Sequence, residues 1–120
     1  MTSQGSAYHR FRRALDRGNV TEALSAAAEL QFVGLTEALE LCLLIREKEP
    51  ARYTRAALRW HGRYCREVDG TFEEAQAVLA ALALLAGDRK RNAAYALAEL
   101  LSRRGLERPC EALVAWAREA

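Results

Sequence analysis

The placing of glycine and the near absence of proline most constrain the fold of this chain. Only two prolines occur in 120 residues, and five of the seven glycines fall between segments whose apolar residues recur three or four positions apart. That spacing gathers apolar side chains on one face of an α-helix. Few windows alternate apolar and polar residues, as a half-buried strand does. The sequence therefore predicts an all-α protein.

The spacing of the breaks predicts about seven short helices. Short connections between helices favour antiparallel neighbours, and two consecutive helices take about the length of a helical-repeat hairpin. The first helix is expected to begin near residue 7. We therefore expect a disordered tail at residues 1–6 and one compact domain at residues 7–120, built as a helical bundle or a short, repeat-like stack of helical hairpins.

Local signals place several helix ends. Thr36 is expected to cap the third helix, and Pro50 suits the first position of the fourth. Thr71 and Glu74 form the pattern of a capping box at the start of the fifth. Gly18 is expected to end the first helix and Gly105 the sixth. These signals fix where helices begin and end but not how they pack.

Two of the expected helices are apolar on every side. The third contains LCLLI, and the fifth reads AQAVLAALALLA. A helix without a polar face is expected to lie centrally with neighbours all round. The residues predicted to be largely buried are Leu41, Leu43, Leu44, Trp60, Val78, Leu79 and Leu82.

Composition and cysteine usage indicate a soluble protein of the cytoplasm. Hydrophobic residues make up 51% and charged residues 28% of the chain, the balance of a globular protein. The first residues lack the apolar stretch of a signal peptide, and the longest apolar run is about half the ~20 residues of a membrane span. Three cysteines without a CxxC pattern fit reduced, mostly buried thiols. We expect no membrane partner.

The expected fourth helix carries an unusual surface. On an ideal helix its five arginines fall within an arc of about 80 degrees, and its aromatic residues fall on the opposite side. Four like-charged pairs three or four residues apart would cost an isolated helix about 1–2 kcal/mol. We call these residues the arginine face: Arg52, Arg55, Arg59, Arg63 and Arg66.

Three explanations of the arginine face remain open. It is a solvated face or one paired with glutamates of neighbouring helices, it meets an acidic partner protein, or it binds nucleic acid. A second basic spot, at Arg89, Lys90 and Arg91, opens the sixth helix, where free N–H groups favour a phosphate. A solvated turn capped by Asp88 is the preferred explanation of this spot. Since 16 of the 18 basic residues are arginine, GC-rich coding accounts for part of the clustering.

Motifs of catalysis and metal binding are missing from the sequence. The two histidines belong to no hydrolase, metalloprotease or nucleotide-binding pattern. His61 and Cys65 share a helix face and offer two metal ligands, whereas a zinc site needs three or four. A nucleophilic Cys65 would need an oriented imidazole, and nothing obvious orients His61. We therefore expect no enzyme, no metal and no cofactor.

The expected position of Trp116 indicates a further intermolecular contact surface. It lies off the apolar side of the expected seventh helix, and an exposed Trp near a chain end is a plausible contact residue. The sequence therefore predicts a weak homodimer or a partner contact there.

The segment GLTEALELCLLIREKEPARYTRAALRWHGRYCRE, followed by TFEEAQAVLAALALLAG, resembles short, uncharacterised all-helical proteins of high-GC actinobacteria. The resemblance covers most of the chain after Gly18 and implies an all-helical fold, with no activity attached.

The leading hypothesis is a small non-enzymatic interaction module whose arginine face binds an acidic partner. The alternative is a nucleic-acid-binding protein that uses the same face with Arg89, Lys90 and Arg91.

Overall fold

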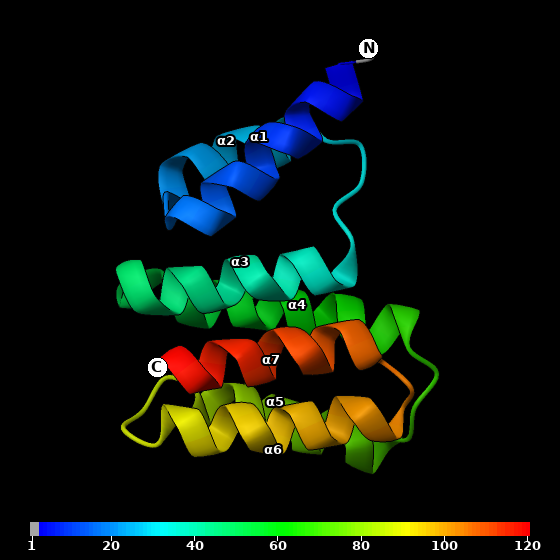
Figure 1. Ribbon diagram of the computed structural model, residues 1–120. Coiled ribbons are helices and arrows are strands. Elements are labelled where there is room, and N and C mark those ends of the chain that lie inside the picture. Colours follow the sequence, from blue (N-terminus) through cyan, green and yellow to red (C-terminus); the bar gives the residue numbers. More distant parts are fainter. Residues whose placement is uncertain (1–2) are drawn as a thin grey trace.

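The computed structural model describes residues 3–120, and every regular element within them is helical (Figure 1). This confirms the predicted all-α class. The radius of gyration is 13.9 Å, close to the about 13.6 Å expected for a compact chain of this length. The elements are α1 (Ser3–Arg17), α2 (Val20–Glu29), α3 (Leu35–Lys48), the 3₁₀ turn η1 (Pro50–Arg52), α4 (Tyr53–Glu67), α5 (Phe72–Leu84), α6 (Lys90–Arg103) and α7 (Glu107–Glu119).

The helices lie in layers around α3 (Figure 1). The hairpin of α1 and α2 covers one side of α3, while α4 and α7 pack against α3 elsewhere. α5 and α6 form the far layer, in contact with α4 and α7 respectively. Since α3 contacts four other α-helices, its predicted central position is confirmed.

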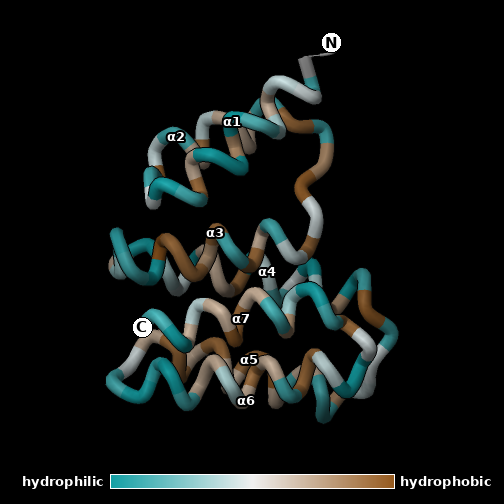
Figure 2. The backbone as a smooth tube through the Cα atoms, viewed as in Figure 1, coloured by the Kyte–Doolittle hydropathy of each residue, from teal (hydrophilic) through white to brown (hydrophobic). Residues whose placement is uncertain are grey.

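The core is divided into a large and a small cluster. The large one is built from α2 to α7 and contains Trp60, Leu82 and Leu101 among its buried residues. The small one lies inside the α1–α2 hairpin around Phe11. Leu41 of α3 packs against both clusters. In Figure 2 brown, hydrophobic backbone recurs along α3 and α5, whereas α1 is largely teal and white. α1 is therefore the least apolar of the α-helices in residues 3–120.

Helix starts differ from the sequence expectations in two places. α1 begins at Ser3 rather than near residue 7, so part of the expected tail at residues 1–6 is helical; residues 1–2 lie outside the described chain. The Gln4 side chain ties this first turn to the end of α2, since its Nε2 donates to the Glu29 carbonyl at 2.8 Å. The expected Thr36 cap is wrong: the N-cap of α3 is Gly34, two residues earlier, and no side chain caps the helix.

Other predicted signals are confirmed. Thr71 and Glu74 form the capping box at α5, with both hydrogen bonds 3.1 Å long. Gly18 and Gly105 end their helices with φ of 72° and 76°, a conformation in which a Cβ is unfavourable. The Pro50 prediction is confirmed only in part, because Pro50 opens the 3₁₀ turn η1 and α4 begins three residues later, at Tyr53.

The prediction that α5 lies centrally is wrong. α5 contacts only α4 and α6 among the elements of residues 3–120, so one face meets solvent. Leu79 on that face is exposed, whereas Val78 and Leu82 are buried. The composition of α5 gives no polar side, but the fold provides neighbours for only part of its circumference.

Burial of the other predicted core residues is mixed. Leu43 and Trp60 are buried as expected, but Leu41 and Leu44 of α3 are only half-buried. Both lie where the α1–α2 hairpin leaves part of α3 uncovered. The cysteine expectation also fails at Cys65, whose side chain is exposed on α4. No helix within residues 3–120 has the length and apolar character that crossing a membrane requires.

The Glu74–Arg104 ion pair joins the start of α5 to the end of α6. The Arg104 guanidinium donates to both carboxylate oxygens of Glu74 and, at 3.2 Å, to the Asp69 carbonyl. The hydrogen bonds from Arg104 and from the Thr71 backbone lower the pKa of Glu74 from 4.5 to about 2. The folded chain therefore favours the ionised carboxylate.

This pair predicts an acid-dependent contribution to stability. Because the pKa of Glu74 is lower in the folded chain, its contribution is complete above pH 4.5 and is lost as the pH falls toward about 2. Glu74→Gln keeps a residue suited to the capping box but removes the charge. In denaturant melts across this range, the stability difference between wild type and Glu74→Gln should shrink with falling pH. A difference that stays constant would contradict the assignment.

Candidate functional site: a basic groove

The orientation of α4 is fixed by its buried aromatic side chains. Tyr53 donates its hydroxyl to the Leu82 carbonyl at 2.7 Å, and Trp60 donates its indole N–H to the Leu35 carbonyl at 2.9 Å. Trp60 also stacks on Tyr64, with ring centroids 5.6 Å apart. These contacts hold the aromatic face of α4 against the core. The opposite, arginine-bearing face is thereby turned outward, as the helical spacing predicts.

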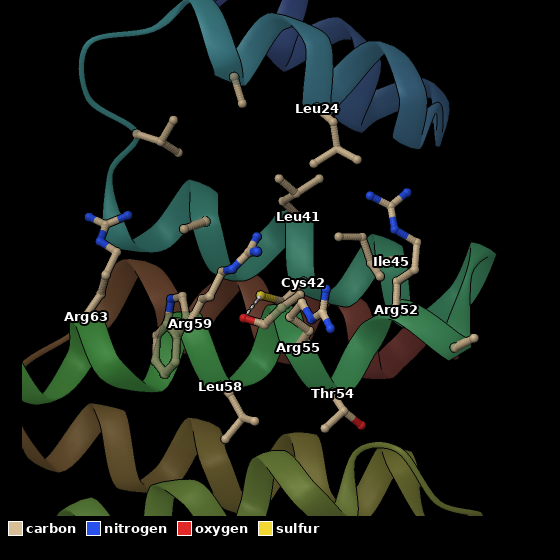
Figure 3. A pocket seen from close by; sticks show the side chains of 16 residues that line it. Leu24, Leu41, Cys42, Ile45, Arg52, Thr54, Arg55, Leu58, Arg59 and Arg63 are labelled. Carbon is tan, nitrogen blue, oxygen red and sulfur yellow. Dashed lines mark hydrogen bonds between the residues drawn. The ribbon is translucent and has the colours of Figure 1, made fainter.

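A groove of about 810 Å³ lies between α2, α3 and α4. Leu24 projects into it from α2, and Leu41 and Ile45 from α3, as Figure 3 shows. Arginines of η1 and α4 form its other side (Figure 3). We call this site the basic groove, since every charged residue that lines it is an arginine; the four are Arg52, Arg55, Arg59 and Arg63.

Two of these arginines are paired within the chain. Arg52 bonds Glu49 at 2.8 Å, and Arg63 bonds Glu67 at 2.8 Å. The Arg63 guanidinium also lies 5.4 Å from the centroid of the Phe32 ring. The explanation of the arginine face by internal pairing thus holds at both ends of the groove.

The two middle arginines are different. Arg55 and Arg59 are exposed, and neither forms a hydrogen bond or ion pair with any residue in 3–120. They lie one helical turn apart, so their positive charges repel each other by roughly 0.2–0.5 kcal/mol. Their chains border an apolar floor that lowers the local screening by water. The structure therefore concentrates uncompensated positive charge at the centre of the groove.

The apolar floor of the groove, formed by side chains of α2 and α3, offers no activated nucleophile. Burial raises the pKa of the Cys42 thiol to about 12, so this group stays protonated at neutral pH. Its Sγ donates to the Ala56 carbonyl at 3.5 Å. One donor on the wall has no acceptor within the described residues, the buried Arg63 Nη2. The groove thus offers N–H donors and apolar surface rather than a nucleophile.

The remaining predicted binding residues lie away from the groove. Arg66 is exposed on the last turn of α4 and does not line it. Lys90 pairs with Glu47 at 2.8 Å and lies 5.6 Å from the Trp116 ring centroid. Arg91 donates to the backbone oxygen of Ala120, and Arg89 is exposed without an ion pair in residues 3–120. The fold therefore does not join Arg89, Lys90 and Arg91 to the basic groove.

Most glutamates of the neighbouring helices form ion pairs with residues other than the arginines of the groove. Arg12 of α1 bonds both oxygens of Glu40 on α3, at 3.0 and 2.8 Å, which fastens the hairpin to α3. Glu37 pairs with Arg108 and Glu74 with Arg104. Because these carboxylates are engaged elsewhere, they leave Arg55 and Arg59 uncompensated.

His61 and Cys65 lie together as their spacing predicts. The Cys65 sulfur is 3.7 and 3.8 Å from the two ring nitrogens. His61 Nε2 lies 2.7 Å from the Ala75 carbonyl and donates its proton there, so the backbone of α5 orients the ring, which sequence reasoning missed. No cluster of three His, Cys, Asp or Glu suited to a metal occurs within residues 3–120.

Sequence reasoning also missed the far wall of the groove. Leu24 and Ala27 belong to α2 and Val33 to the segment after it. Their spacing indicates an ordinary apolar helix face, and nothing local shows that this face stops short of α4. Only the tertiary placement of the hairpin reveals that wall.

Comparison of the chain with models of protein families, with curated proteins and with solved structures finds no match. The function must therefore be inferred from the residues of the groove.

Proposed function

We propose that this protein is a non-enzymatic interaction module that binds an acidic, partly apolar segment of a partner protein in the basic groove. The observation that carries this proposal is the pair Arg55 and Arg59, exposed and uncompensated beside an apolar floor. Carboxylates of a partner would supply the missing counter-charges, and bidentate pairing with guanidinium groups favours carboxylates. Apolar side chains of the same segment would cover Leu24, Leu41 and Ile45.

The apolar floor favours a protein segment over nucleic acid. Single strands bind where several aromatic rings and cations share one surface. Phe32 beside Arg63 is exposed, but Tyr53, Trp60 and Tyr64 of α4 are buried, so within residues 3–120 no row of stacking rings accompanies the arginines. Lys90 and Arg91, the second basic spot of the nucleic-acid hypothesis, already contact groups of the chain itself. A groove with arginines on one wall and leucines on the other suits an amphipathic acidic peptide better.

A designed peptide tests this proposal directly. The probe is a fluorescent helix with leucines three and four residues apart and flanking glutamates, and its reference is the same helix with glutamine for glutamate. We expect the acidic peptide to bind wild type at least about tenfold more tightly than the neutral one. Fluorescence anisotropy measures both affinities, and binding of the acidic peptide should weaken with added salt.

Two charge-reversal variants locate the site. Arg55→Glu/Arg59→Glu should weaken binding of the acidic peptide at least about tenfold and keep the helical circular dichroism, because it also removes a like-charged pair. The control Arg13→Glu/Arg66→Glu makes the same change of net charge at exposed residues outside the groove. It should bind nearly as wild type does.

Three results would contradict the proposal. The first is equal weakening by both variants, which would show only a general charge effect. The second is that the acidic and neutral peptides bind equally well, or that neither peptide binds. The third is a gel shift of DNA or RNA at low salt that Arg55→Glu/Arg59→Glu abolishes, which would assign the groove to nucleic acid instead.

A further inference from the structure

The two ends of the basic groove differ in their chemistry. At one end Arg52 is paired with Glu49, and both side chains are in contact with water. Arg63 marks the opposite end of the row of arginines (Figure 3), and there the exposed ring of Phe32 lies against its guanidinium. An acidic segment that fills the groove therefore meets an ion pair at one end and an aromatic ring at the other.

Phe32 is an exposed ring on an ordered support. It belongs to the segment between α2 and α3, next to Val33 of the groove, and it is 70% exposed. The Arg63 guanidinium carbon lies 5.4 Å from the ring centroid, within the range of a cation–π contact. Glu67 in turn accepts a hydrogen bond from Arg63 Nε at 2.8 Å. Because these contacts already order the ring, a partner that packs on it would cost little further conformational freedom.

The contacts of Arg63 within the chain are incomplete. Its Nε donates to Glu67, but the buried Nη2 has no acceptor in residues 3–120. Arginine and aromatic residues are both enriched in protein interfaces, and here they adjoin the uncompensated centre of the groove. Trp116, the aromatic contact residue expected from the sequence, is instead half-buried near Lys90 and does not line the groove.

We propose that Phe32 is the anchor residue of the basic groove, and that the acidic partner segment carries an aromatic side chain at one end that packs on it. This inference rests on the proposed function. Arg59 and Arg55 lie one and two helical turns from Arg63, about 6 and 12 Å along α4. On a helical segment lying along α4, the acidic residues that face these two arginines would stand about one and two turns from the aromatic residue.

One aromatic residue added to the acidic peptide tests the anchor. Two versions of the fluorescent acidic helix carry a tryptophan, either one turn before the first glutamate or one turn after the last. Each is compared with a counterpart that has alanine at that position. We expect at least one tryptophan peptide to bind wild type about three- to tenfold more tightly than its counterpart in fluorescence anisotropy. Because the paired peptides carry the same charge, this ratio should change little with added salt.

A second exposed phenylalanine provides the matched control. Phe32→Ala should abolish the gain from tryptophan, while the alanine peptide keeps its wild-type affinity to within about twofold. Phe32→Tyr keeps a ring and should retain most of the gain. Phe72, the first residue of α5, is 74% exposed and lies outside the groove, so Phe72→Ala should leave the gain unchanged. A merely structural role of Phe32 would instead weaken both peptides alike.

The anchor proposal is overturned if neither tryptophan peptide gains over its counterpart, if the gain survives Phe32→Ala, or if Phe72→Ala removes it as well. In each of these cases the proposed function still stands, provided that the acidic peptide binds in preference to the neutral one and depends on Arg55 and Arg59. If no acidic peptide binds, the proposed function fails and the anchor fails with it.

Discussion

Replacing Leu82 with alanine should lower the free energy of unfolding by about 2–5 kcal/mol. Leu82 is 1% exposed and lies in the large core cluster, where α5 packs against α4. Its own carbonyl accepts the hydroxyl of Tyr53 at 2.7 Å, which holds the backbone of α5 against α4. The surrounding helices are therefore poorly placed to collapse into the space left by the shorter side chain. Urea melts followed by circular dichroism would measure the loss.

A matched substitution separates burial from residue type. Leu58 of α4 is 55% exposed, so Leu58→Ala removes the same atoms from a largely solvated position. It should cost less than about 1 kcal/mol. Similar losses for the two variants would mean that α5 is not seated on the core as the structure has it. For the same reason, Leu44→Ala should cost less than Leu82→Ala, because Leu44 is only half-buried.

Removing Arg108 should destabilise the protein by about 1–3 kcal/mol, because it leaves a buried carboxylate without its counter-charge. Glu37 is 7% exposed, and Arg108 Nη2 lies 2.7 Å from its Oε2. Gly34 gives this carboxylate its space, since a Cβ there would lie 2.5 Å from the other oxygen, Oε1. Glu37 is thus enclosed at the start of α3, and Arg108 reaches it from α7. Arg108→Ala can be compared with wild type in denaturant melts.

The Arg103–Glu99 pair provides the control for Arg108. Arg103 is about as exposed as Arg108, but its partner Glu99 is exposed too. Arg103→Ala should therefore cost no more than about 0.5 kcal/mol. In a Glu37→Gln background the effect of Arg108→Ala should largely disappear, because no buried charge remains to be compensated. A loss that persists there would assign the role of Arg108 to packing alone.

The candidate site was only partly predictable. The arc of arginines on α4 follows from helical spacing, as does the inward position of Tyr53, Trp60 and Tyr64. The pairing of the two outer arginines is local as well, since Glu49 lies three residues before Arg52 and Glu67 four residues after Arg63. Spacing does not show that Glu40 and Glu74 turn to Arg12 and Arg104 instead of the arginine face, because that depends on distances between helices. The gap between α2 and α4 leaves no local signal in the sequence. The wall that Leu24 forms on the α2 side of the groove leaves none either.

By itself, the sequence determined that the chain is helical, that Gly18 and Gly105 end helices, that Thr71 and Glu74 open α5, and which face of α4 is aromatic. Each of these depends on residues within one or two turns of each other, where backbone geometry alone decides the outcome. Only the tertiary structure decided that α3 lies centrally while α5, the more apolar of the two, lies at an edge. The apolar composition of a helix indicates how much apolar surface it could remove from water by packing. How many helices contact it is set by how the whole chain packs.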